Sequence, residues 1–246
     1  MNARFYAPDA HEIDSEIDLP EDEAQHVARV LRLKAGDSLA VFNGRGGEFA
    51  ATIATMTKSR VIVRLSASAI AKAEFPVAFT LAQAVLKGDK MDDVVRDAVM
   101  LGYAAVQPIV TARSEVSLAT LTRGDRHERW HQIAVSSAKQ CGRAVVPAVA
   151  PPVAFEGPAS LAHLPSPQFL LVEPGASTAT TAVSGVARTA PAAVTIIIGP
   201  EGGWTAEELQ RCASHAHPLG LGPLTLRADA AAVVAGTALM THWKLI

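Results

Sequence analysis

The spacing of apolar residues changes near residue 75 of this 246-residue chain. Before that point, short stretches alternate apolar and polar positions, as half-buried strands do. Residues 38–53 alternate in this way around Asn43-Gly44, a pair typical of a hairpin turn, and residues 59–67 predict a further strand. Short strands separated by glycine-rich turns predict a small β-barrel domain over residues 1–70.

One amphipathic helical turn is predicted before the hairpin. Val27, Val30 and Leu31 have the i, i+3, i+4 spacing of a buried helical face. Arg29 and Arg32 then fall on the wetter side of the same turn.

A different pattern follows a predicted linker at residues 66–76, which lacks a period and large core side chains until its end. Apolar runs that suit buried strands alternate with helical patterns, and this alternation predicts a parallel α/β sheet covered on both faces over residues 75–246. The predicted strands are 77–85, 103–111, 167–175 and 192–200, and the helical segments are 90–102, 124–142, 179–189 and 230–245. The Ala- and Pro-rich residues 145–160 are predicted to cross the surface of this domain.

Net charge, cysteine spacing and the lengths of the apolar segments exclude several classes of protein. The net charge of −2 excludes a generally basic nucleic-acid protein, so RNA binding would need a local patch. Cys141 and Cys212 have no CxxC spacing and indicate a reducing compartment. The amino terminus lacks an apolar leader, and no stretch reaches the roughly 20 apolar residues of a membrane span. We therefore expect a cytoplasmic protein without membrane contact.

The most informative segment is "IIIGPEGGW", residues 196–204, where a buried strand ends in a glycine-rich loop. Ligands bind at the carboxyl ends of strands in open α/β sheets, and glycines let a backbone approach a ligand closely. Thr205 and Glu208 then form a capping-box pattern that starts a helix. Strand, loop and capped helix suggest a cofactor cradle; a tight turn that needs glycine for geometry alone is the alternative.

Two more loops of this kind follow predicted strands. One is "EPG" at residues 173–175, and the other is "LGP" at residues 221–223, before a long Ala-rich helix. A GxGxxG loop between a strand and a helix and a Walker lysine loop are both absent, because "GRGGEF" at residues 44–49 belongs to the hairpin. The sequence therefore disfavours dinucleotide-binding and P-loop folds.

Seven stretches, taken in order, share the pattern of one family. They are 26–37, 42–53, 81–95, 101–114, 129–147, 196–209 and 221–232. Together they cover nearly the whole chain and resemble the RsmE family of 16S rRNA uridine-N3 methyltransferases, in the SPOUT superfamily.

This resemblance implies an N-terminal PUA-like RNA-binding barrel and a C-terminal parallel sheet with a deep trefoil knot. It also implies a homodimer that acts on 16S rRNA in the small ribosomal subunit, with S-adenosylmethionine as cofactor. The loops that would hold the cofactor contain Val172, Glu173, Pro174, Gly199, Pro200, Glu201, Gly202, Gly203, Leu221, Gly222, Thr225 and Leu226. The apolar helix 230–245 suits a subunit interface, although an ordinary core helix explains it equally well.

Methyl transfer to uracil N3 requires loss of the N3 proton, by a base or with cations that stabilise the uracil anion. Arginine suits the second role because it is planar and always charged. Arg113 and Arg227 are the catalytic candidates, and for Arg113 a solvated or structural arginine is the alternative. Asp229 could orient Arg227, act as base, or simply cap the last helix.

A set of basic residues could contact RNA phosphates, although each one alone could be an ordinary surface charge. The candidates are His26, Arg29, Arg32, Lys34, Arg45, Lys87, Lys90 and Arg143. His127 and His131 have an i, i+4 spacing, but no third ligand accompanies them and no metal site is predicted.

Four positions depart from the family pattern. Leu224 stands for an arginine and Asp229 for a glutamate, while Asp97 and Met100 stand for a lysine and a glutamate. The loss of an arginine and a lysine puts the affinity for the RNA substrate, or its identity, in doubt more than it does cofactor binding. Three alternatives stay open: an RNA-binding protein without catalysis, a methyltransferase for another RNA, and a nucleotide-dependent enzyme.

Overall fold

The computed structural model describes residues 3–57, 60–176, 180–212 and 215–246. The chain divides into two compact units, and we describe each by itself. The first contains Met1–Glu74 and Val135–Val146, and the second contains Phe75–Ala134 and Pro147–Ile246. Residues 135–146, which the sequence places in the α/β domain, thus cluster with the N-terminal unit.

The N-terminal unit is a curled sheet of five strands in the order β1-β3-β4-β5-β2. The strands are β1 (Arg4–Tyr6), β2 (Glu16–Asp18), β3 (Ser38–Phe42), β4 (Glu48–Met56) and β5 (Val61–Ala69). β3 and β4 pair antiparallel across residues 43–47, so the predicted hairpin is confirmed. Alternate residues of these strands, such as Leu39, Val41 and Ile53, are buried in one hydrophobic core.

The predicted helical turn forms, but the residues that it buries differ from the predicted ones. α1 (Glu21–Gln25) continues into a π-helix, η1 (His26–Leu31), in which Val27 is fully buried. Val30 and Leu31 are 68% and 42% exposed, so their predicted burial is wrong. The i→i+5 bonding of a π-helix widens the turn, and residues spaced for one face of an α-helix then point apart.

The predicted linker begins later than expected, because β5 runs to Ala69 and pairs with β4 along that length. Beyond it, Glu74 forms an ion pair with the buried Arg143. The guanidinium of Arg4 donates to the carbonyl oxygens of Ala138, Lys139 and Arg143 at 3.1, 3.3 and 2.7 Å. A cation thus satisfies carbonyls at the end of a helix, where they have no intrahelical partner.

Arg143→Gln is expected to lower the free energy of unfolding by about 1.5–3 kcal/mol, because it removes hydrogen bonds between two charged groups. Urea denaturation would measure this change. The double variant Arg143→Gln/Glu74→Gln should recover part of the loss. An RNA affinity that falls without any loss of stability would contradict this structural role.

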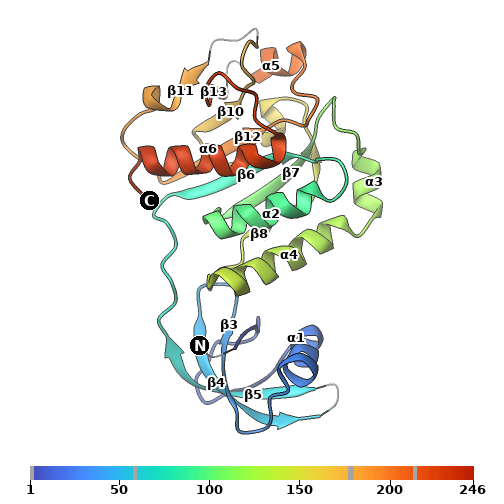
Figure 1. Ribbon diagram of the computed structural model, residues 1–246, viewed down its shortest axis with the longest axis vertical. Helices are drawn as coiled ribbons and strands as arrows, with labels where there is room; N and C mark the ends of the chain where they lie inside the picture. The colour runs from blue at the N-terminus through green and yellow to red at the C-terminus, as the bar shows by residue number, and fades with distance from the viewer. Residues whose placement is uncertain (1–2, 58–59, 177–179, 213–214) are drawn as a thin grey trace. The chain divides into compact units, whose positions relative to one another are not determined.

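The second unit is a parallel sheet, as predicted, in the order β11-β13-β10-β12-β6-β7-β8 with β9 also pairing with β7 (Figure 1). Its strands are β6 (Ala78–Ala84), β7 (Ala105–Val110), β8 (Ala148–Val149), β9 (Val153–Ala154), β10 (Gln168–Leu171), β11 (Thr181–Ala182), β12 (Ala193–Ile198) and β13 (His217–Gly220). The trefoil knot, which strand pairing alone does not define, stays a prediction.

The helices are α2 (Lys90–Leu101), α3 (Leu118–Arg123), α4 (Arg126–Cys141), α5 (Ala206–Cys212) and α6 (Ala228–His242), with single 3-10 turns η2 (Pro158–Leu161) and η3 (Val183–Gly185). Gly102 and Gly142 follow α2 and α4 with φ of 100° and 84°, as the predicted helix ends require. The helical segment predicted at 179–189 is wrong over its described residues 180–189, where β11 pairs with β13 and only η3 is helical.

α6 packs on α2, β6 and β12, and Figure 1 shows it lying along the sheet. The Tyr103 hydroxyl donates to the carbonyl oxygen of Ala232 at 2.8 Å, and its burial raises the pKa of this phenol. Gly236 permits the contact, because a Cβ there would lie 2.6 Å from that hydroxyl oxygen. α6 is therefore a core helix on one face, while Val234 is exposed on the other.

Candidate functional site

The candidate site lies at one edge of the parallel sheet. The neighbouring strands β13, β10, β12, β6 and β7 all run in the same direction, so their carboxyl ends meet there. The loops that follow β10, β12 and β13 are the three glycine- and proline-containing segments singled out in the sequence.

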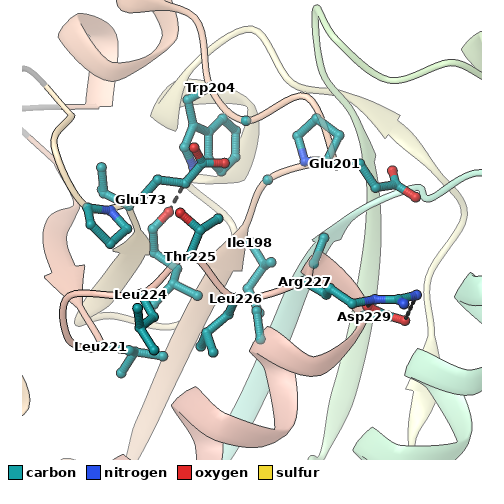
Figure 2. A pocket seen from close by; sticks show the side chains of 18 of the residues that line it. Glu173, Ile198, Glu201, Trp204, Leu221, Leu224, Thr225, Leu226, Arg227 and Asp229 are labelled. Atoms are coloured by element: carbon teal, nitrogen blue, oxygen red, sulfur yellow. Dashed lines mark hydrogen bonds and ion pairs between the residues drawn. The ribbon is translucent and has the colours of Figure 1, made fainter.

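These three loops enclose a cavity of about 300 Å³ (Figure 2). Every predicted cofactor residue lines it except Gly202. Leu224, within the predicted third loop, also lines the cavity, as do Leu171, Ile198, Trp204, Ala228 and Ala231, which were not predicted. The predicted convergence of the loops is therefore present in the structure.

Trp204 joins two of the loops. Its indole Nε1 donates to the carbonyl oxygen of Leu171, at the end of β10, over 2.8 Å. Its ring packs against Phe155 with centroids 5.2 Å apart. A Cβ at Gly199 would lie 3.0 Å from this ring, so glycine lets the loop lie against the indole. Sequence reasoning gave the indole no role, although its place directly after "GPEGG" was the available signal.

The capping box predicted after the loop is present. The Thr205 amide donates to Glu208 Oε2 at 2.9 Å, and the Glu208 amide donates to Thr205 Oγ1 at 3.1 Å. Glu208 is buried, and its Oε1 accepts a 2.9 Å hydrogen bond from the Ala112 amide in the loop after β7. One carboxylate thus begins α5 and fixes a neighbouring loop of the same sheet edge.

Charged side chains gather at one end of the cavity, opposite Glu173 and Trp204 (Figure 2). The Arg227 guanidinium binds both carboxylate oxygens of Asp229, at 3.1 and 2.9 Å. Hydrogen bonding and charge within this pair raise the pKa of Arg227 and lower the pKa of Asp229. Because the pKa of Asp229 is lowered, its carboxylate is ionised at neutral pH and the ion pair with Arg227 is intact. The pair is lost only when the pH falls below the ordinary aspartate range and the carboxylate is protonated.

Asp229 does not cap α6. The N-cap position is Arg227, and the Asp229 carboxylate binds its guanidinium instead. Of the roles left open for Asp229, orientation of Arg227 is the one that these contacts support.

A second ion pair lies at the same end of the cavity. Lys90, the first residue of α2, donates to Glu201 Oε1 over 2.8 Å, and the Lys87 amide contacts the same oxygen at 3.4 Å. Burial alone would raise the pKa of Glu201, but these hydrogen bonds outweigh it and the pKa is lowered. The ion pair thus connects the glycine-rich loop to α2. The side chains of Lys90 and Glu201 both stay partly exposed to solvent.

Arg113 does not line this cavity. It lines a neighbouring cavity of about 280 Å³, and the two cavities share Val172, Glu173, Pro174, Gly203 and Trp204. Arg113 Nη1 donates to the Gly202 carbonyl oxygen at 2.7 Å, and a Cβ at Gly202 would lie 3.2 Å from Arg113 Cβ. The structure therefore brings Arg227, rather than Arg113, to the first cavity.

The predicted RNA-contact residues separate into two groups. Arg29, Arg32, Lys34, Arg45 and Lys87 are exposed, and Lys90 is partly exposed in its pair with Glu201. His26 is half-buried beside Phe5 and Lys139, and Arg143 is buried in its pair with Glu74. An RNA phosphate could reach Arg143 only by displacing that carboxylate.

Comparison with known proteins matches both units to RNA methyltransferases. A family model described as an RNA methyltransferase domain matches residues 73–240, and one described as an RNA methyltransferase PUA domain matches residues 19–66. Ribosomal RNA small subunit methyltransferase E of Rickettsia conorii is 30% identical, covering 90% of this chain and 88% of that protein. The enzyme of that name from Synechocystis is also 30% identical, over 91% and 72% of the two chains. The chain belongs to the ribosomal RNA small subunit methyltransferase E family.

A solved structure extends the match to this methyltransferase's fold. Ribosomal RNA small subunit methyltransferase E from Neisseria gonorrhoeae, solved with bound S-adenosylmethionine, has a TM-score of 0.85 and 30% identity, covering 99% of this chain and 98% of that one. The parallel sheet and the PUA domain expected for this methyltransferase are thereby confirmed.

Two further expectations concern this methyltransferase as a whole. In the described part of the chain, no group of three or more His, Cys, Asp or Glu side chains is arranged to hold a metal ion. His127 Nε2 instead donates to the carbonyl oxygen of Val149 at 2.8 Å. Among the helices of the described residues, none has the length and apolar character that a membrane crossing requires.

Proposed function

We propose that this methyltransferase transfers the methyl group of S-adenosylmethionine to N3 of a uridine in 16S rRNA. The cavity formed by the loops after β10, β12 and β13 carries this proposal, together with the family of the chain. A relative of 30% identity binds this cofactor over nearly the same fold, which supports the choice of cofactor.

The residues of the cavity fit the cofactor's chemistry. Ile198, Leu221 and Leu226 offer apolar surface to an adenine ring, and Gly199 and Gly203 leave backbone open to the ligand. Glu173, Glu201 and Asp229 place carboxylates around a ligand that carries a sulfonium and an ammonium group. When bound, the cofactor supplies the electrophilic methyl carbon.

In this proposal Arg227 stabilises charge on the target base. Uracil that loses its N3 proton carries negative charge on N3 and its two carbonyl oxygens, and a fixed guanidinium stabilises that charge without reorganising. The two bonds to Asp229 hold the Arg227 plane in place. Lys90, which also lines the cavity, adds a second cation whose position Glu201 fixes.

The proposal also covers the compartment, the oligomeric state and the form of the RNA substrate. The protein acts in the cytoplasm as a homodimer, and it modifies the assembled small subunit better than bare RNA. The net charge of −2 supports the last point, because a chain without a general positive charge has little non-specific attraction to naked RNA. Equal turnover on a naked transcript would contradict that preference.

Nucleoside mass spectrometry of rRNA from cells with and without the gene tests the function directly. We expect 3-methyluridine in 16S rRNA only when the gene is present, and calorimetry should show S-adenosylmethionine binding by the purified protein. Cofactor binding with no change in rRNA would favour an RNA-binding protein without catalysis. A different methylated nucleoside would favour another RNA substrate, and ATP or NAD binding in place of the methyl donor would favour a nucleotide-dependent enzyme.

Gly203→Ala is expected to weaken S-adenosylmethionine binding at least tenfold. Gly203 has a φ of 68°, and a Cβ there would lie 2.8 Å from Glu173 Oε1, so alanine strains the backbone and displaces a side chain of the cavity wall. Calorimetry gives the dissociation constant. Gly88→Ala is a matched control, because its φ is 64° but a Cβ would have no neighbour within 4 Å. Equal cofactor affinity of the two variants would show that the contact between residue 203 and Glu173 does not affect cofactor binding.

A further inference from the structure

The charged side chains of the cavity that the loops after β10, β12 and β13 enclose do not balance. They are two cations and three carboxylates and leave one formal negative charge: Lys90, Glu173, Glu201, Arg227 and Asp229. Lys90 pairs with Glu201 at 2.8 Å, and Arg227 pairs with Asp229 at 2.9 Å. The uncompensated charge is therefore that of Glu173.

Glu173 lies apart from the two ion pairs. Figure 2 shows its side chain beside Trp204, while Glu201, Arg227 and Asp229 lie at the other end of the cavity. In the described part of the chain, no hydrogen bond or ion pair engages the Glu173 carboxylate. A positively charged ligand would therefore meet a carboxylate whose attraction no neighbouring protein cation offsets.

The backbone holds this carboxylate at the cavity wall. The preceding residue, Val172, is buried, and its amide donates to the Leu219 carbonyl oxygen at 3.1 Å. Gly203 leaves room for the carboxylate, because a Cβ there would lie 2.8 Å from Glu173 Oε1. Arg113 lines the neighbouring cavity together with Glu173, but its Nη1 donates to the Gly202 carbonyl oxygen at 2.7 Å. The fold thus fixes the position of Glu173 without giving its charge a partner.

The methyl donor and the spent cofactor differ in charge. S-adenosylmethionine carries a sulfonium, an ammonium and a carboxylate group, so it has one net positive charge at neutral pH. When the methyl group moves to N3 of the base, the bond from sulfur to the methyl carbon breaks and its electron pair stays on the sulfur. The product, S-adenosylhomocysteine, is then a neutral thioether with no net charge. A cavity with one negative charge complements the donor and not the product.

We propose that Glu173 makes the cavity select S-adenosylmethionine over S-adenosylhomocysteine, so that the spent cofactor leaves and is replaced. The inference rests on the proposed function, since it takes S-adenosylmethionine as the cofactor, and it gives Glu173 a role in specificity rather than in the chemical step. The carboxylate attracts the positive sulfur before transfer, and this attraction ends when the sulfur becomes neutral. Glu201 and Asp229 contribute less, because their cations offset them.

Two variants and a matched control isolate this charge. Glu173→Gln removes the charge and keeps the shape of the side chain, while Glu173→Asp keeps the charge and shortens the side chain by one methylene. Residue 173 is exposed, so neither substitution should unfold the protein. The control Glu207→Gln changes the net charge by the same amount, at an exposed residue of α5 that lines neither cavity.

Calorimetry of each purified full-length protein gives its dissociation constants for S-adenosylmethionine and S-adenosylhomocysteine at low and high KCl. Glu173→Gln should weaken binding of the donor about threefold to tenfold and that of the product less than about twofold, because one charge pair at a partly exposed site is lost. Glu173→Asp should fall between this variant and the wild type. High KCl should reduce the preference of the wild type for the donor and leave that of Glu173→Gln unchanged, since salt screens exposed charges. Glu207→Gln should bind both ligands as the wild type does.

An unchanged ratio of the two dissociation constants in Glu173→Gln would overturn the proposal. An equal loss of affinity for both ligands would mean that the carboxylate contacts a group that methyl transfer leaves unaltered. An equal change of the ratio in Glu207→Gln would also overturn it, because the preference would then follow the charge of the whole protein. Failure of the proposed function is distinct, since the wild-type protein itself would bind no S-adenosylmethionine or leave the rRNA unmethylated.

Discussion

Arg227→Ala is expected to lower kcat for methyl transfer by about 10²–10³-fold, while the dissociation constant for S-adenosylmethionine changes less than about threefold. Loss of one preorganised group that stabilises developing negative charge typically has an effect of this size. The guanidinium lines the cavity, is held by Asp229 and is otherwise largely exposed, so its removal should not unfold the protein. Single-turnover methylation with saturating cofactor and RNA would measure the effect.

Three comparisons make this expectation specific. Arg227→Lys should recover part of the rate, because a cation remains without the planar fork. Arg96→Ala is the control, since Arg96 pairs with Asp93 and Asp97 on α2 and does not line the cavity. Arg113→Ala should also lower turnover more than cofactor affinity, but less than Arg227→Ala, because Arg113 reaches the site only through the Gly202 carbonyl. Unchanged kcat in Arg227→Ala would remove this arginine from the mechanism.

Trp204→Ala is expected to lower the free energy of unfolding by about 3–5 kcal/mol, the usual range for removing a large buried aromatic side chain. The side chain is 9% exposed, packs on Phe155 and bonds to the carbonyl oxygen of Leu171. Urea denaturation followed by circular dichroism would measure the loss, and cofactor affinity should fall with it because the indole joins two loops of the cavity.

Trp204→Phe separates the ring from its hydrogen bond. It keeps most of the packing and loses only the Nε1 donor, so we expect a cost of about 1–2 kcal/mol, which includes the unsatisfied carbonyl of Leu171. A Trp204→Ala protein as stable as the wild type would contradict the joining role given to this residue.

The sequence predicted the parallel sheet and the ligand edge because both depend on local patterns. Buried strands such as 192–200 read as continuous apolar runs, and the glycine loop and the Thr205–Glu208 capping box follow directly from the residue types. The position of the loops at one edge then follows from parallel pairing. These features need no knowledge of distant contacts.

The features that the sequence did not show depend on the type of helix or on contacts between residues far apart in the chain. The π-helix turned Val30 and Leu31 outward against their spacing. The pairing of Arg143 with Glu74 joins residues far apart in the chain, so the sequence could not show that a carboxylate engages this guanidinium. The same reason hid the bond from Trp204 to Leu171 and left Arg113 and Arg227 equivalent until their cavities were known.

The placement of Trp204 has a spectroscopic consequence. The chain has three tryptophans, and Trp130 and Trp243 are buried and do not line the cavity. In a Trp130→Phe/Trp243→Phe background, intrinsic fluorescence would come from the one indole that forms a wall of the cavity. Stopped-flow emission could then follow occupancy of the cavity in real time, without a label.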